Sequence, residues 1–236
     1  MTVHVVHLYA AEMNIYGDNG NVQVLRRRLE WRGIPVQVHR VGVGDPLPVD
    51  THVLVGGGGQ DAGQAVITED LAGRGPELIA RAADGLPMLL VCGMYQMAGH
   101  YFQPYQAPRL AGIGLLDVHT EAGPTRLIGN VVADSDFGPL VGYENHSGLT
   151  YLGSQARPLG RTSTGQGNNG TDGTEGARRG HVIGTYLHGP LLAKAPQVAD
   201  YLLGAALRLA GRDETLEPLD DGLAAEAARV ARSRPR

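Results

Sequence analysis

The chain has 236 residues and a mass of 24.9 kDa, which suits one α/β domain with a tail better than two full domains. Its net charge of -4 and its lack of a basic run interleaved with aromatic residues exclude nucleic acid as an expected partner. The first residues carry no signal-peptide pattern and no apolar run could span a bilayer, so we expect a cytoplasmic protein without a membrane span.

The first hundred residues alternate predicted strands and helices. The expected elements are strands at 3–9, 36–41, 51–55 and 86–91, a helix marked by Val22, Leu25 and Leu29 and capped by Gly33, a helix marked by Leu78, Ile79 and Ala82 that ends at Gly85, and a helix beginning at Gly93. The order β-α-β-β-α-β-α predicts an α/β fold with a mainly parallel central sheet and helices on both faces. Ligands of such sheets bind at the carboxyl ends of the strands.

The second half of the chain is predicted to add antiparallel strands, a loop and helices. The expected elements are short strands at 126–132, 141–143 and 181–186, a long exposed loop over 154–180, a helix after Pro196 and an alanine-rich helix within 214–236. The loop is expected because 154–180 is rich in Gly, Thr, Asn and Arg and has few apolar residues. We expect one domain over 1–212 and a C-terminal helical tail over 213–236 whose last residues are mobile.

Cys92 lies between the buried strand at 86–91 and the helix that begins at Gly93. A strand-to-helix turn of this kind holds a nucleophile in a strained conformation and directs it at a helix N-terminus, which stabilises an anion. Cys92 is the only cysteine, so it cannot form an internal disulfide. The alternative is a small buried thiol of the core, but the turn and Gly93 favour a nucleophile.

A cysteine nucleophile needs a base, and His188 is the candidate because it follows the strand at 181–186. It shares a sheet edge with Cys92 if that last strand joins the sheet near its centre. Oxyanion donors would be the Gly93 N–H and an N–H from the run 57–59. That run is followed by Gln60 and lacks the lysine of a phosphate-binding loop, so we expect no ATP site in this chain.

Seven segments together resemble one known family. They are 14–21 (NIYGDNGN), 57–61 (GGGQD), 92–96 (CGMYQ), 125–129 (TRLIG), 142–151 (GYENHSGLTY), 167–170 (GNNG) and 184–190 (GTYLHGP). With them the chain resembles class I glutamine amidotransferase domains of the cobyric acid synthase-like branch over nearly its whole length. The elbow at Cys92 is shared by many amidotransferases, whereas the segments around His146 and His188 are more specific.

The resemblance implies that L-glutamine is hydrolysed through a Cys92 thioester, with His188 passing a proton to the leaving ammonia and Gly58 and Gly93 holding the oxyanion. The ammonia would go to a synthetase subunit that resembles a Mur ligase and amidates a glutamate of the peptidoglycan precursor.

Two further positions match substrate-binding residues of the family. Arg126 would bind the α-carboxylate of glutamine, and Gln96 would contact the substrate amino acid. No metal and no cofactor is expected in this chain, while ATP and Mg are expected on the partner.

One position departs from the family pattern, because Pro190 stands where the family carries an acid two residues after the histidine. An orienting acid can change kcat on the order of 10⁴-fold. We hypothesise that the acid comes in trans from the partner, with Glu144 and Asp18 as alternatives within the chain. Two other functions stay open: amidation of a different acceptor such as a corrinoid carboxylate, and a non-catalytic binding subunit.

Overall fold

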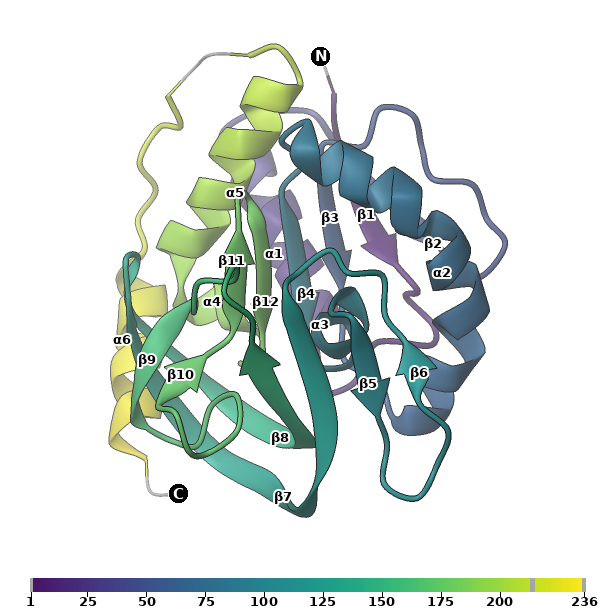
Figure 1. Cartoon of the computed structure of the whole chain (residues 1–236). Coiled ribbons are helices and arrows are strands. Elements are labelled where there is room, and N and C mark those ends of the chain that lie inside the picture. Colours follow the sequence, from purple (N-terminus) through teal and green to yellow (C-terminus); the bar gives the residue numbers. More distant parts are fainter. Residues whose placement is uncertain (1, 213–214, 235–236) are drawn as a thin grey trace.

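The computed structural model describes residues 2–212 and 215–234 (Figure 1). The predicted boundary after residue 212 falls on 213–214, and 235–236 end the predicted tail; these four residues lie outside the described part of the chain. The described residues form two sheets and six helices.

The first sheet has the strand order β11-β12-β4-β3-β1-β2 and forms the centre of the molecule. Its strands are β1 (Val3–Leu8), β2 (Val36–Val41), β3 (Val53–Gly56), β4 (Met88–Val91), β11 (Ala177–Arg179) and β12 (Val182–Thr185). Every neighbouring pair is parallel except β11 with β12. The predicted order of strands and helices up to Cys92 is therefore confirmed, and the last strand does join the sheet beside β4.

Helices cover both faces of this sheet, as predicted (Figure 1). One face carries α1 (Asn19–Glu30), α4 (Leu191–Lys194) and α5 (Pro196–Leu209), and the other carries α2 (Asp61–Ala83) and α3 (Gly93–Ala98). All residues of β3, β4 and β12 are buried, because both faces of these central strands are covered.

Helix α2 begins much earlier than the sequence pattern indicated. The residues Gly73, Gly75 and Pro76 are weak helix formers, so the first half of α2 was not predicted. Ile67 and Leu71 are nevertheless buried one turn apart and pack into the core. Burial of this face outweighs the low propensity of the glycines and proline.

The second sheet is built on a long antiparallel hairpin of β7 (Val118–Ser135) and β8 (Gly138–Leu152), which lies at one end of the molecule (Figure 1). Its other strands are β5 (Tyr101–Gln103), β6 (Leu110–Ala111), β9 (Gly160–Thr164) and β10 (Thr174–Glu175). The predicted antiparallel additions are present, but the strands predicted at 126–132 and 141–143 are only fragments of the hairpin. Exposed polar positions interrupt the apolar pattern along it.

The prediction of an exposed loop over 154–180 is wrong, because this segment contains β9, β10 and β11. Asn168 and Asn169 are buried, and their side chains donate to the backbone carbonyls of Gly176 and Thr150 at 2.9 and 3.0 Å. Polar side chains thus satisfy the hydrogen-bonding groups of the buried backbone in this segment. Strands are predicted from apolar patterns, and this segment has none, so its order could not be predicted from the sequence.

The last helix, α6 (Gly222–Ser233), lies beside α4 and the β7–β8 hairpin and has no buried residue. The charged pair of Arg28 with Asp221, the residue before α6, ties it to α1, and Arg28 also pairs with Asp200. No helix of the described residues is both long and apolar enough to cross a bilayer.

Candidate active site

The loops that follow four neighbouring parallel strands meet at one edge of the first sheet. His188 follows β12, Cys92 follows β4, the run 57–59 follows β3 and Asp18 follows β1 by one loop. Because β12, β4, β3 and β1 are adjacent and parallel, their carboxyl ends lie at the same edge. The sheet order alone therefore brings these distant segments together.

Cys92 occupies a sharp turn with φ 50° and ψ -105°, between the end of β4 and the start of α3. A non-glycine residue in this region costs on the order of 1–3 kcal/mol of backbone strain. The Cys92 N–H donates to the Thr185 carbonyl at 2.8 Å, which ties the turn to β12. The side chain is buried but lines a cavity, as expected of a nucleophile elbow.

His188 is fully buried, and its backbone exchanges two hydrogen bonds with Tyr143 of β8. Its Nδ1 donates to Asp18 Oδ1 at 3.0 Å. Burial by itself lowers the pKa of His188, but the hydrogen bond to Asp18 and the interaction with the Cys92 thiol raise the pKa to about 10. Because Asp18 occupies Nδ1, Nε2 is the ring nitrogen that remains for proton exchange with Cys92, and it has no hydrogen-bond partner among the described residues.

The contact favours Asp18, one of the two alternatives within the chain, over an acid supplied in trans. Asp18 is fully buried directly before α1, so the hypothesis of an acid supplied in trans loses its motivation. Glu144, the other in-chain alternative, accepts the backbone N–H groups of Gln166 and Gly167 at 2.9 and 2.8 Å instead. The sequence named both carboxylates but could not choose between them, because 170 residues separate Asp18 from His188.

The oxyanion prediction needs a correction at Gly58. The Gly58 N–H donates to Asp18 Oδ2 at 2.6 Å, so it is not free to bind a substrate oxygen. A Cβ at Gly58 would come within 2.9 Å of His188 Cε1, so a side chain there would displace the imidazole. Gly59 N lies 3.0 Å from the point where a Cβ of Gly93 would be. Gly59 therefore lies beside Gly93 and lines the cavity, so it replaces Gly58 as the candidate for the second oxyanion donor.

The cavity at Cys92 has a volume of about 420 Å³, within the usual range for small-molecule sites. Its lining residues are Ile15, Tyr16, Gly59, Gln60, Gln64, Cys92, Gln96, Phe102, Arg126, Asn145, His146 and Ser147. Three of the predicted site residues, Cys92, Gln96 and Arg126, are therefore brought together, with His188 buried behind Cys92.

Arg126 reaches the mouth of the cavity from an irregularity in β7, where residues 123–126 stand opposite Ser147 alone. Its Nε and Nη2 donate to the side chain and the backbone carbonyl of Asn145, each at 3.0 Å. Asn145 in turn donates to the Tyr16 hydroxyl at 2.8 Å. These contacts hold the exposed guanidinium in one place, where it can meet a carboxylate.

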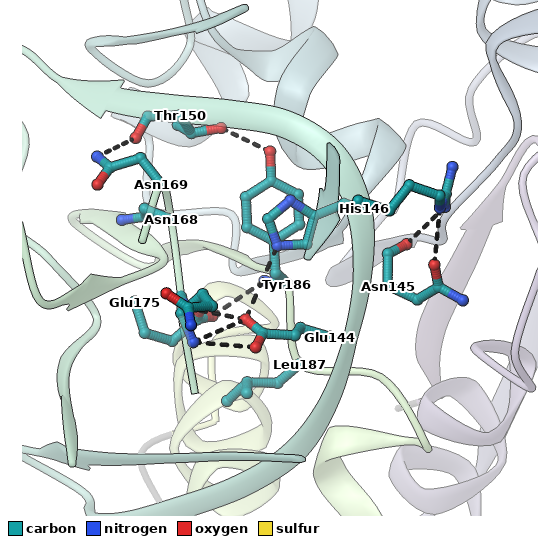
Figure 2. Close-up of polar contacts among 12 residues, drawn as sticks. Glu144, Asn145, His146, Thr150, Asn168, Asn169, Glu175, Tyr186 and Leu187 are labelled. Atoms are coloured by element: carbon teal, nitrogen blue, oxygen red, sulfur yellow. Dashed lines mark hydrogen bonds and ion pairs between the residues drawn. The ribbon is translucent and has the colours of Figure 1, made fainter. Parts of the chain in front are cut away.

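Gln96 lines the cavity, but its amide is bonded within the protein. Its Oε1 accepts from Gln64 Nε2 at 2.7 Å, and its Nε2 donates to the Tyr186 hydroxyl at 3.1 Å. The Tyr186 hydroxyl also pairs with Thr150 at 2.6 Å (Figure 2). Both polar atoms of the Gln96 side chain are thus engaged within the protein, so a contact of Gln96 with a substrate would have to share one of them.

His146 also lines the cavity, and its ring stacks on Tyr186 with 3.5 Å between ring centroids and an angle of 6° (Figure 2). His146 Nδ1 donates to the Gly148 carbonyl at 2.6 Å, whereas Nε2 is 4.0 Å from Glu144. Burial lowers the pKa of His146 to about 4, so this ring is neutral at pH 7.

Comparisons with known proteins agree with this geometry. Residues 4–196 match the family model of the CobB/CobQ-like glutamine amidotransferase domain. The chain is 38% identical to the GatD subunit of lipid II isoglutaminyl synthase (glutamine-hydrolyzing) from Staphylococcus aureus, over 88% of this chain and 85% of that protein. The subunit of the same name from Streptococcus pneumoniae is 33% identical, over 96% of this chain and 89% of that protein.

Among solved structures, PurLQS from Thermotoga maritima shares the fold, with a TM-score of 0.61 and 14% identity over 86% of this chain and 99% of that chain. The resemblance that the motifs indicated is confirmed by these matches. Together with the elbow at Cys92, they show that the chain belongs to the CobB/CobQ-like glutamine amidotransferase domain family.

Proposed function

We propose that this chain is the glutaminase subunit of a two-subunit complex that amidates the glutamate of the lipid II stem peptide to isoglutamine. The observation that carries the proposal is the likeness to two GatD subunits over most of the chain. The arrangement of Cys92, His188 and Asp18 beside a cavity supports the glutaminase chemistry.

In the proposed reaction, His188 takes the thiol proton of Cys92, and Cys92 Sγ attacks the carboxamide carbon of L-glutamine. The N–H groups of Gly93 and Gly59 stabilise the oxyanion, and His188 gives its proton to the nitrogen as ammonia leaves. The product is a thioester of Cys92. His188 then takes a proton from water, which attacks the thioester and releases glutamate. Asp18 keeps the His188 imidazole in one orientation throughout.

The amino-acid end of glutamine would lie at the mouth of the cavity. Arg126 is the cation among the lining residues, and its fixed guanidinium suits the α-carboxylate. This places the carboxamide of the substrate toward Cys92, deeper in the cavity.

The partner in this proposal is a Mur ligase-like synthetase subunit that binds ATP and Mg and receives the ammonia. The run 57–59 supports this division of labour, because its Gly59 lines the Cys92 cavity and the run is followed by no lysine for a nucleotide phosphate. A partner that consumes ATP also favours a cytoplasmic location for the complex.

The experiment that tests the proposal measures glutamate release from L-glutamine by the full chain, first alone and then with a Mur ligase-like partner. Cys92→Ser serves as the blank. We expect release that is absent in the blank and a transfer of nitrogen to lipid II when the partner and ATP are present. No release in either condition would contradict the glutaminase assignment, whereas release without transfer to lipid II would contradict only the acceptor.

A further inference from the structure

The cavity next to Cys92 contains a cation for the carboxylate of an amino acid, but it contains no carboxylate for the ammonium group. Arg126 can bind a carboxylate, but an α-amino acid also carries an ammonium group that needs an acceptor. None of the described lining residues is an aspartate or glutamate. A neutral oxygen must therefore accept hydrogen bonds from the ammonium group.

Of the four side-chain amide oxygens in the lining, two already accept one hydrogen bond each from a neighbouring side chain. Gln96 Oε1 accepts from Gln64, and Asn145 Oδ1 accepts from Arg126. Gln96 was the residue expected to contact the amino acid, and its Nε2 is also occupied by Tyr186. Gln64, which donates a hydrogen bond to Gln96, is therefore the stronger candidate for binding the ammonium group.

Gln64 projects from α2 into the same cavity wall and is 1% exposed. Its Nε2 donates to Gln96 Oε1 at 2.7 Å and to the Gly93 carbonyl at 3.3 Å. Because both acceptors lie on the nitrogen side, the amide cannot be turned around without losing them. Its Oε1 accepts no hydrogen bond from the described residues. This oxygen is nevertheless not one of the fully buried polar atoms without a partner, so it is accessible from the cavity.

We infer that Gln64 Oε1 accepts a hydrogen bond from the α-ammonium group of bound L-glutamine, an inference that rests on the proposed glutaminase function. Gln64 then makes the site prefer amide substrates that carry an α-amino group, such as L-glutamine, over amides of the same length that lack it. A hydrogen bond to a charged donor contributes about 1.5–3 kcal/mol, which corresponds to roughly 10-fold or more in substrate preference.

The experiment compares kcat/KM for L-glutamine with kcat/KM for 4-carbamoylbutanoate, which lacks only the α-amino group, in the complex with its partner. In Gln64→Met, which keeps the side-chain length but removes the acceptor, we expect the preference for L-glutamine to fall about 10-fold. Gln37→Met is the matched control, since Gln37 is exposed on β2 at the opposite end of the sheet. The ratio cancels any general loss of activity that Gln64→Met causes through Gly93 or Gln96.

Gln64→Glu provides a second test if Gln64→Met does not fold. It keeps an oxygen acceptor and adds negative charge, so its preference for L-glutamine should equal or exceed that of the natural chain. An unchanged ratio in Gln64→Met, with both substrates slowed equally, would overturn the inference and leave Gln64 with a packing role. Absence of glutamate release by the natural complex would overturn the proposed function itself, and the inference with it.

Discussion

The molecule holds two buried histidines in contrasting settings. His188, at the end of the parallel sheet, donates to Asp18 at 3.0 Å, and its pKa is raised despite burial. His146, on the antiparallel hairpin, is 4.0 Å from Glu144 and bonds a neutral carbonyl, so that burial lowers its pKa. A bonded carboxylate can outweigh desolvation, whereas a carboxylate beyond hydrogen-bond distance does not.

The contrast separates a ring that can exchange protons with a thiol from a ring that serves as a stacking surface. His188 is bonded to Asp18 and keeps Nε2 without a hydrogen-bond partner, whereas His146 lies flat against Tyr186. The roles of the nearby carboxylates differ in the same way. Asp18 orients an imidazole, and Glu144 holds the backbone of residues 166 and 167.

The largest effect is expected for Asp18→Asn, which keeps the size of the side chain but removes its charge. Loss of the orienting carboxylate should lower kcat for glutamate release by about 10³–10⁴-fold, by analogy with the serine-protease triad. Steady-state glutamate release, with a circular dichroism spectrum to establish folding, is the measurement. A folded Asp18→Asn variant with near-natural kcat would revive the idea of an acid from the partner.

Gly58→Ala should disturb the contact between His188 and Asp18 by a steric clash. The new Cβ would lie 2.9 Å from His188 Cε1 and 3.1 Å from Asp18 Oδ2, so the imidazole must shift. A displacement of this kind near the reacting atoms costs about 10²-fold in kcat. Gly73→Ala in α2 is the matched control, because nothing lies within 4 Å of a Cβ there. Equal activity of the two variants would argue against close packing of Gly58 on His188.

The two histidines should also give opposite pH dependences of stability. The folded pKa of His146 is below its usual 6.5, so its contribution is present above pH 6.5 and is lost as pH falls to about 4. His146→Gln should therefore flatten the loss of unfolding free energy over pH 6.5–4, by up to about 3 kcal/mol. Urea unfolding at a series of pH values measures this.

For His188 the sign is reversed, since its folded pKa is raised. Its contribution is present below pH 6.5 and declines as pH rises toward about 10. Asp18→Asn should flatten the curve on this alkaline side and leave the acid side unchanged. A variant that flattened both sides would show that the two histidines are not independent.

The smallest effect on activity is expected for Glu144→Gln. The amide oxygen can still accept a backbone N–H, and Glu144 does not touch Cys92 or His188 in the hydrogen-bond network described. Glutamate release should stay within about three-fold, while unfolding free energy falls by about 1 kcal/mol through the weakened hydrogen bonds. A loss of kcat comparable to that of Asp18→Asn would mean that the second sheet takes part in proton transfer.

The sequence by itself determined the central features of this protein. The alternation of apolar strands and helices up to residue 98 fixed a parallel α/β fold, and the strand, turn and helix around Cys92 predicted the elbow. These are local patterns, since periodicity and turn chemistry act over a few neighbouring residues. Seven motifs together, of which those around His146 and His188 are the more specific, indicated the family.

Only the tertiary structure decided how the site is completed. Asp18 meets His188 because β1 and β12 lie in one sheet with two strands between them, a relation that no local pattern contains. The segment 154–180 is ordered by buried asparagines, and α2 extends through three glycines and a proline, because long-range packing and hydrogen bonding outweigh local preference. The same packing leaves the amide of Gln96 occupied and that of Gln64 open to the cavity.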